Sequence, residues 1–196
     1  MRLIDTAREE PDGVMDDGLT DEAGRIAAAQ ADPAAFAALY RRYLPRVYRY
    51  LRARAPVPED AADLTQQVFL QALDALPAYR PSGAPFAAWL FRIARHVAID
   101  ADRRRRPTLD VAALPEGLHP ADERGPEAII LRREALAHLD ALLRRLDPEK
   151  RELLALRFGA GLSATEIAAV VGKRPEAVKK QLTRILHALK EQYREA

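Results

Sequence analysis

The sequence predicts an all-α fold of two small helical domains joined by a flexible linker. Ala, Leu and Arg, which favour helices, are abundant, and no β-branched run is bounded by turn residues. Residues 107–126 contain repeated prolines and glycines among few apolar side chains, which is typical of a linker between domains. Of the 196 residues, 48% are hydrophobic, which is enough to bury the cores of two domains.

The composition excludes several kinds of chemistry. The chain has no cysteine, so it has no disulfide, thiolate metal site or catalytic thiol. The histidines are scattered without the spacing of metal ligands, and we expect no metal or other cofactor. No Gly-rich phosphate loop and no nucleophile with an adjacent base can be assembled from the sequence. We therefore expect no enzymatic activity.

The net charge of +2 conceals an uneven distribution along the chain. Residues 1–18 are acidic and poor in apolar side chains, and we expect a disordered leader. Arg103–Arg106 form an unbroken basic run, so local patches decide which partners bind. No apolar stretch approaches the roughly 20 residues that cross a bilayer, and the acidic amino terminus lacks the features of a signal peptide. We expect a cytoplasmic protein without membrane insertion.

The first domain is expected over residues 19–106. A short helix is predicted from about residue 20 to residue 30. Asp32 is a suitable N-cap, and Pro33 fits the first position of the next helix. We expect Pro45 to kink or divide that helix, because proline lacks an amide hydrogen and clashes with the preceding turn.

A third helix is predicted to begin at Pro58, with acidic residues in the first turn, where the helix dipole favours them. One side of this helix is apolar, through Leu64, Val68, Phe69, Ala72, Leu73, Ala75 and Leu76. The other side carries a polar stripe of Asp60, Asp63, Gln67, Gln71 and Asp74. Such a stripe is usually solvated surface, and it indicates a binding surface only where an independent observation points to a partner.

A loop from Pro77 to Pro85 precedes a helix in which aromatic and cationic side chains are interleaved. Tyr79 and Arg80 begin the loop, and the helix carries Phe86, Trp89, Arg92, Arg95, His96 and Arg103. A basic surface with aromatic edges can hold phosphates and stack unpaired bases, at about 1–3 kcal/mol for each stack. Taken singly, Phe86 and Trp89 fit core packing better, whereas the arginines favour nucleic-acid contact.

The second domain is expected over residues 127–196 and begins with an amphipathic helix over residues 129–146. Asp147 and Pro148 are predicted to cap and start the next helix, which ends near Gly159. Two further helices form a predicted helix-turn-helix, which spans residues 161–189.

The helix-turn-helix has clear start and stop signals. Ser163 and Glu166 have the spacing of a capping box, in which each side chain satisfies a free backbone amide of the first turn. Gly172 suits the left-handed residue that ends the first helix. Pro175 fits the first position of the second helix.

The second helix of this motif has an apolar face and a basic face. Apolar residues recur at Val178, Leu182, Ile185 and Leu189. The turn and the opposite face carry cations and hydrogen-bonding groups, at Lys173, Arg174, Lys179, Lys180, Thr183, Arg184 and His187. A helical hairpin with a merely solvated basic face is the alternative. The ordered set of capping box, turn glycine, proline start and basic face favours binding in the major groove of DNA.

Taken together, the two halves resemble the extracytoplasmic-function group of bacterial sigma factors over residues 33–194. The resemblance depends on four segments: Phe36-x-x-Leu39-Tyr40-Arg41-Arg42-Tyr43, Asp63-Leu64-Thr65-Gln66-Gln67-Val68-Phe69-Leu70, Phe86-x-x-Trp89-Leu90-x-x-Ile93-Ala94-Arg95, and the helix-turn-helix from Leu162 through Val178, Lys179 and Arg184. The last is shared with many regulators. The ordered set on both sides of a linker is specific to the family.

The resemblance implies a promoter-specificity subunit that recruits core RNA polymerase, recognises a two-part promoter and helps to melt it. The implied contacts with the clamp helices of the largest polymerase subunit come from Asp63, Gln66, Gln67 and Phe69. The implied minus-ten contacts come from Tyr79, Arg80, Phe86, Trp89, Arg92, Arg95, His96 and Arg103, with a flipped base held at the loop over residues 79–86. The implied minus-thirty-five contacts come from Lys173, Arg174, Lys179, Lys180, Thr183 and Arg184. Further implied partners are the flap of the second polymerase subunit and an anti-sigma factor.

Four positions depart from the family pattern. His96 stands where Asn is common, Gln67 replaces a common acid, and Lys173 and Ala177 replace usually apolar and Thr residues. These changes bear on base preference and on the charge of the docking helix. Two other functions remain open: a polymerase-independent regulator that uses only the helix-turn-helix, and a helical adaptor whose basic faces bind acidic proteins.

Overall fold

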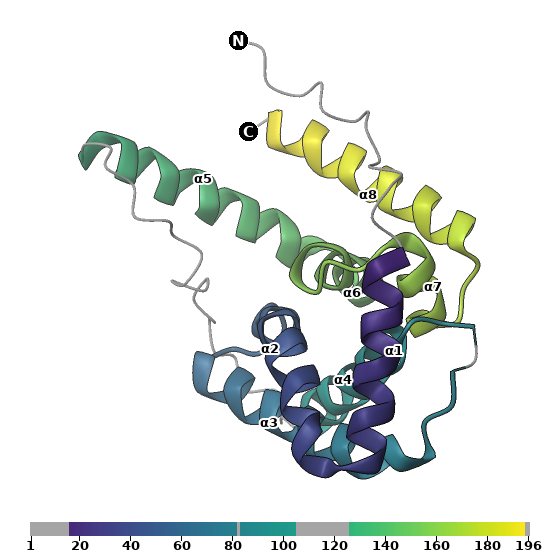
Figure 1. Ribbon diagram of the computed structural model, residues 1–196. Coiled ribbons are helices and arrows are strands. Elements are labelled where there is room, and N and C mark those ends of the chain that lie inside the picture. Colours follow the sequence, from purple (N-terminus) through teal and green to yellow (C-terminus); the bar gives the residue numbers. More distant parts are fainter. Residues whose placement is uncertain (1–15, 82, 105–125, 195–196) are drawn as a thin grey trace.

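The computed structural model describes residues 16–81, 83–104 and 126–194, and all regular structure in these ranges is helical. The N-terminal half contains α1 (Asp16–Ala31), η1 (Pro33–Ala35), α2 (Phe36–Arg52), α3 (Pro58–Ala75), η2 (Leu76–Ala78) and α4 (Phe86–Arg104). The C-terminal half contains α5 (Pro126–Arg145), α6 (Pro148–Leu154), the π-helical turn η4 (Ala155–Gly159), α7 (Ala164–Val171) and α8 (Pro175–Arg194). The all-α prediction is therefore confirmed (Figure 1).

Two of the segments expected from the sequence lie mostly outside the described residues. The acidic leader was expected over residues 1–18, and α1 begins inside it, at Asp16. The remainder of that segment is not described, nor is the expected linker over residues 107–126, except for Pro126 at the start of α5. In the described part of the chain, no helix is both long enough and apolar enough to span a bilayer.

The predicted helix starts are confirmed where a side chain caps the helix. Asp32 accepts a hydrogen bond of 2.9 Å from the Ala34 amide, and Asp147 accepts one of 2.9 Å from the Lys150 amide. Pro45, however, does not divide α2, which continues to Arg52. Pro45 is exposed, so water can reach the carbonyl group that its missing amide leaves unpaired.

The four long helices of the N-terminal half pack around a core that α2 supplies on one side and α4 on the other. Its most deeply buried large side chains are Leu39, Tyr43, Val47, Tyr50, Leu51, Leu76, Leu90 and Phe91. Glu22 attaches α1 to this core, because it accepts a hydrogen bond from the Tyr43 hydroxyl and lies 3.6 Å from Arg42 Nε. Burial and Glu22 together raise the pKa of Tyr43 far above its usual value.

The predicted apolar face of α3 needs one correction. Val68, Phe69 and Ala72 are buried, but Ala75 is exposed at the C-terminal end of the helix. Thr65 is buried instead, and its hydroxyl donates a hydrogen bond of 2.6 Å to the Ala61 carbonyl. A helical hydrogen bond to the preceding turn allows this polar side chain to occupy an apolar face.

The helices of the C-terminal half pack around the predicted apolar face of α8. Val178, Leu182, Ile185 and Leu189 are all buried, as the spacing predicts. They meet apolar residues of α6 and α7, which include Leu153 and Ile167. In the upper part of Figure 1, α5 and α8 lie side by side, and the His138 ring lies 5.1 Å from the Tyr193 ring between them.

The two halves are packed directly against each other. Helix α4 contacts α7, and α2 contacts η4 (Figure 1). Their buried apolar residues belong to one continuous cluster. At Gly159 the two backbones come close, since a Cβ atom there would lie 3.3 Å from the Tyr50 Cα atom. The sequence predicts two domains on a tether but gives no sign of this contact between them.

Candidate nucleic-acid interface

The helix-turn-helix has the predicted local geometry. The Ser163 amide donates to Glu166 Oε2 at 2.7 Å, and the Glu166 amide donates to Ser163 Oγ at 3.2 Å. Gly172 ends α7 in the left-handed region with φ 71°. Because non-glycine residues rarely adopt this conformation, Gly172 sets the angle at which α8 leaves the turn.

Helix α8 presents a cationic face opposite its buried face. Lys179, Lys180 and Arg184 are exposed, as is Arg174 in the turn. Thr183 is exposed as well, and its hydroxyl donates to the Lys179 carbonyl at 3.0 Å. These side chains therefore share one solvent-facing surface, on which cations can reach phosphates and base edges.

Lys173 differs from the other cations of this set. Its ammonium group is ion-paired with Glu149 of α6 and lies 3.0 Å from Gln181 Oε1. The same contact holds the pKa of Glu149 below its usual range. Lys173 thus ties the turn to α6, and its charge is partly neutralised within the domain.

The cations of α4 divide into two groups. Arg92, His96 and Arg103 are exposed, and Arg103 lies 4.0 Å from Asp100. Arg95 is instead turned toward the C-terminal half, where its Nε lies 3.6 Å from Glu152 Oε1. The sequence could not predict this pairing, because Glu152 belongs to a helix of the other half.

The aromatic residues assigned to the minus-ten element lie mainly in the core. Tyr79 is 7% exposed and Phe86 is 2% exposed, and their rings are 5.4 Å apart in an edge-on arrangement. Trp89 is half-buried, with its ring 5.0 Å from Tyr79 and 5.1 Å from Phe86. Neither ring presents a face to solvent in this conformation, which agrees with core packing for Phe86. The minus-ten contacts of Tyr79 and Phe86 stay a prediction.

Helix α1 holds the loop that begins at Tyr79. Gln30 Nε2 donates to the Leu76 carbonyl at 3.0 Å and to the Tyr79 carbonyl at 2.9 Å. Arg80 Nη1 donates to the Pro77 carbonyl at 3.0 Å and to the Tyr79 carbonyl at 2.9 Å. A largely apolar cavity of about 250 Å³ lies between α1 and the loop, lined by Glu22, Ile26, Gln30, Tyr79, Pro85 and Phe86. The sequence gives no sign of this contribution of α1, because nothing in the pattern of residues 20–30 points to this loop.

The α3 residues implied in the polymerase contact need one correction, at Phe69. Asp63 and Gln66 are exposed and Gln67 is half-buried. Phe69 is 4% exposed and its ring packs 4.6 Å from the Tyr40 ring, so it belongs to the core and cannot face a partner. The apolar side chain beside the stripe is Leu70, which is 63% exposed.

A shallow cavity lies beside this stripe. It is lined by Asp60, Asp63, Leu64, Gln67, Asp100 and Arg104, and its volume is about 250 Å³. The cavity lies between the polar stripe of α3 and the C-terminal end of α4. Among the described residues, no group of His, Asp and Glu side chains has the arrangement needed to hold a metal ion.

Comparison with known proteins gives a consistent assignment for both halves. Residues 39–108 match sigma-70 region 2, and residues 136–189 match sigma-70 region 4. The chain is 39% identical over 156 residues to the ECF RNA polymerase sigma factor BldN of Streptomyces coelicolor, covering 79% of this chain and 58% of BldN. It is 38% identical over 154 residues to the ECF RNA polymerase sigma factor SigD of Mycobacterium tuberculosis, covering 76% of this chain and 72% of SigD.

A solved structure supports the same assignment. CnrH, in complex with the cytosolic domain of CnrY, superimposes with a TM-score of 0.63 at 28% identity and covers 85% of this chain and 93% of the CnrH chain. The likeness extends over both halves and is therefore not limited to the helix-turn-helix.

Proposed function

The chain belongs to the extracytoplasmic-function sigma factors of bacterial RNA polymerase, and we propose that its two halves read the two elements of a promoter. Members of this family direct RNA polymerase in transcription initiation. In the proposal, α8 binds the minus-thirty-five element, α4 and the loop before it bind the minus-ten element, and α3 binds core polymerase. None of these roles requires a catalytic side chain.

The observation that carries the proposal is the cationic face of α8. Lys179, Lys180 and Arg184 are exposed on a helix whose opposite face is fully buried, and Gly172 and the capping box fix its approach. A rigidly held helix with cations toward solvent is suited to the major groove, where phosphate contacts set the register and a few side chains read bases.

We assign the minus-ten element to the exposed cations of α4 and to the cavity beside α1. Arg92 and His96 can neutralise phosphates of a separated strand. Extruding a base costs a few kcal/mol, which contacts in a closed pocket must offset. The cavity between α1 and the loop is lined mainly by apolar groups, and Glu22 and Gln30 also line it. It is a suitable place for such a base.

We assign the polymerase contact to Asp63, Gln66, Gln67 and Leu70 of α3. These residues follow one another at helical spacing and face solvent, whereas Phe69 supports them from the core. An exposed apolar side chain flanked by polar groups is the usual composition of a protein-binding surface. The flap of the second polymerase subunit is proposed as a further contact of the C-terminal half.

We further propose that an anti-sigma factor controls this protein. The support is indirect: the solved CnrH structure contains the cytosolic domain of CnrY. Such a partner would bind the folded chain and compete with core polymerase.

Run-off transcription with purified core polymerase and a library of promoters tests the proposed function. We expect start-site selection that depends on both promoter elements. The Lys180→Glu/Arg184→Glu variant should lose dependence on the upstream element, and the Glu191→Gln variant is the matched control on the same helix. Tight duplex binding by the free chain without any transcription would instead favour the polymerase-independent regulator, and failure of both assays would favour the adaptor.

A further inference from the structure

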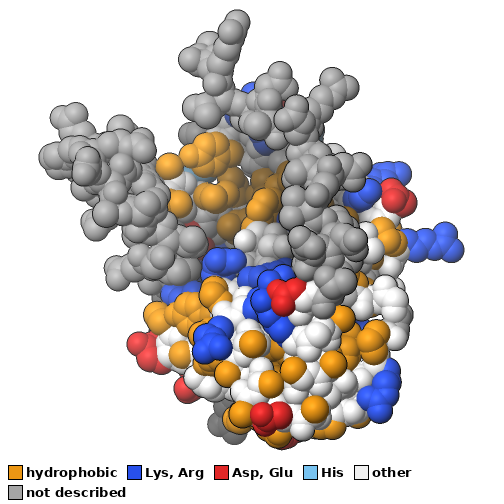
Figure 2. Space-filling view, viewed as in Figure 1, with side chains coloured by type: hydrophobic (Ala, Val, Ile, Leu, Met, Phe, Trp, Pro, Cys, Tyr) orange, Lys and Arg blue, Asp and Glu red, His pale blue; other side chains and the backbone are white. Residues whose placement is uncertain are grey.

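The contact between the two halves is built on arginines. Arg46 and Arg49 of α2 reach the end of η4, where Arg46 Nε donates to the Ala160 carbonyl at 2.8 Å and Arg49 Nε donates to the Gly159 carbonyl at 3.2 Å. Carbonyls at the C-terminal end of a helix carry partial negative charge. The C-terminal half therefore offers these cations an electronegative surface. Figure 2 shows Lys and Arg side chains gathered across the middle of this face, where the two halves meet.

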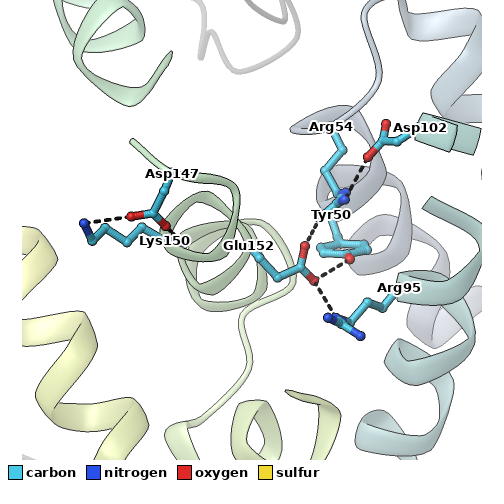
Figure 3. A network of polar contacts seen from close by, with 7 residues as sticks. All are labelled: Tyr50, Arg54, Arg95, Asp102, Asp147, Lys150 and Glu152. Carbon is cyan, nitrogen blue, oxygen red and sulfur yellow. Dashed lines mark hydrogen bonds and ion pairs between the residues drawn. The ribbon is translucent and has the colours of Figure 1, made fainter. Parts of the chain in front are cut away.

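Glu152 of α6 brings a full negative charge into the same contact (Figure 3). Its side chain is 9% exposed and lies between α2 and α4. It accepts a hydrogen bond of 2.8 Å from the Tyr50 hydroxyl, is ion-paired with Arg54, and lies 3.6 Å from Arg95 Nε. A buried carboxylate of this kind persists only where cations compensate its desolvation.

The arginines are held in place by groups of their own half. Arg54 Nη2 lies 3.0 Å from Asp102 Oδ2, and the Arg54 guanidinium lies 5.8 Å from the centre of the Tyr50 ring. The Arg46 guanidinium lies 5.4 Å from the centre of the Tyr43 ring. These contacts do not involve the C-terminal half. Arg46 and Arg54 would therefore stay close to their positions if that half moved away.

The carboxylate of Glu152 does not use all the donors that surround it. Arg54 Nε and Arg95 Nε are buried and have no hydrogen-bond partner among the described residues. A guanidinium offers five N–H donors in a planar fork, and this fork matches the oxygens of a phosphate. The two unused donors therefore leave room for further acceptor oxygens beside this carboxylate, such as those of phosphates.

We propose that Arg46, Arg49, Arg54 and Arg95 form a binding surface for DNA backbone phosphates, and that Glu152 occupies this surface as an internal substitute for a phosphate. The proposal rests on the proposed function, in which the N-terminal half binds promoter DNA. Arg95 shares α4 with the exposed Arg92 and His96, so the covered arginines extend the basic surface that α4 already offers.

DNA and the C-terminal half then compete for the same arginines. In the packed arrangement, Glu152 and the carbonyls of Gly159 and Ala160 occupy most of the donors of these arginines. Arg49 is already exposed, but DNA can reach Arg54 fully only after α6 has moved away. A conformational equilibrium between packed and separated halves would thus set the DNA affinity of the free chain.

The test measures separation of the halves and DNA binding in the same set of full-length variants. Because the chain lacks cysteine, Ala62→Cys on α3 and Ala188→Cys on α8 allow a dye pair to report the distance between the halves. The probes for binding are a labelled 15-nucleotide DNA single strand of mixed sequence and its duplex. Glu152→Gln removes the internal charge with little change in shape, and Glu191→Gln, an exposed position on α8, is the matched control.

We expect Glu152→Gln to lower energy transfer and to tighten binding of either probe by about five- to tenfold, as for a modest coupling between two sites. Adding Arg54→Gln should remove this gain and reduce the slope of log affinity against log salt by about 0.7 on the single strand, the loss of one phosphate contact. Gly159→Val separates the halves sterically without changing a charge, and we expect the same gain from it. Gly159→Val also provides the test of the proposal if the Glu152→Gln protein does not fold.

Two results would overturn the proposal. One is lower energy transfer without tighter DNA binding, because the uncovered arginines would then not bind phosphate. The other is a Glu152→Gln and a Gly159→Val protein that fold and behave like the parent in both assays. Failure of the proposed function is distinguishable, since it appears as absent run-off transcription with core polymerase whatever the residue at position 152.

Discussion

The Tyr50 hydroxyl donates a hydrogen bond of 2.8 Å to Glu152 Oε1, although the two residues lie 102 positions apart in the chain. Tyr50 belongs to α2 and Glu152 to α6, so this bond joins the two halves of the protein (Figure 3). Both side chains are buried. A polar pair that is withdrawn from water in this way depends on close packing of the two halves, and changes at either residue report on it.

Alkaline pH should destabilise the protein through Tyr50. Burial raises the pKa of Tyr50 to about 12, against an opposing effect of Arg54 and Arg95. The folded state therefore keeps the proton that the unfolded state loses from about pH 10. The associated stability is fully present below pH 10 and is lost as the pH rises toward 12. Absorbance of tyrosinate at 295 nm follows the deprotonation of Tyr50. Urea unfolding at several pH values measures the loss of stability.

Tyr50→Phe is the variant for this prediction. It should lack the Tyr50 share of the late tyrosinate absorbance, whereas Tyr43 still titrates late. Its unfolding free energy should fall less steeply between about pH 10 and pH 12. Tyr193→Phe removes a half-exposed tyrosine on α8 and should keep the late phase. An unchanged late phase in Tyr50→Phe would show that another tyrosine produces it.

Neighbouring residues of α3 should respond in opposite ways to substitution. Phe69→Ala should lower the free energy of unfolding by about 3–5 kcal/mol, because it removes a buried aromatic ring. Leu70→Ala should leave stability within about 0.5 kcal/mol, because the side chain is exposed. In a binding assay with core polymerase, only Leu70→Ala and Asp63→Ala/Gln67→Ala should weaken association while the fold is retained. If the Leu70→Ala and Asp63→Ala/Gln67→Ala proteins both associate fully with core polymerase, the polymerase contact lies on another surface of the protein.

The cations of the helix-turn-helix should not be equivalent. Lys180→Glu/Arg184→Glu should abolish dependence on the upstream promoter element and leave the melting temperature nearly unchanged, because both side chains are exposed. Lys173→Ala should instead lower stability, because it breaks the contacts with Glu149 and Gln181. Thermal melting and transcription from promoters with and without the upstream element separate the two effects. If Lys173→Ala affects only DNA binding, its contact with Glu149 has no structural role.

Gln30 should act on promoter melting through the loop that it holds. Gln30→Ala removes two hydrogen bonds to the carbonyls of Leu76 and Tyr79, each worth about 1 kcal/mol. We expect slower strand opening, followed by 2-aminopurine fluorescence in the minus-ten element, with little change in duplex binding by α8. The exposed Ala28→Ser on the same helix is a control. Equal opening rates would show that the loop keeps its shape without Gln30.

Much of the fold follows from local signals in the sequence. The caps at Asp32 and Asp147, the capping box of Ser163 and the glycine turn at Gly172 lie where the sequence predicts them. The heptad-like spacing of α8 also identifies its buried face correctly. These features depend on residues within about one or two helical turns of each other, so a short stretch of sequence contains all the information.

The functional surfaces were less predictable. Phe69, Tyr79 and Phe86 belong to segments that resemble binding motifs, but all three are buried. Motif resemblance identifies a segment, whereas exposure depends on which neighbouring helix covers each side chain. Periodicity gave the wrong exposure for Ala75, at a helix end where no neighbour covers it.

The sequence by itself thus determined the helices, their apolar faces and the family. Only the tertiary structure decided that Glu152 meets Arg54 and Arg95, that α1 supports the Tyr79 loop and that the two halves share one core. The physical reason is the distance along the chain over which each kind of signal acts. Helix signals act between residues a few positions apart, whereas a buried ion pair between halves depends on how two finished surfaces fit, and no local pattern encodes that fit.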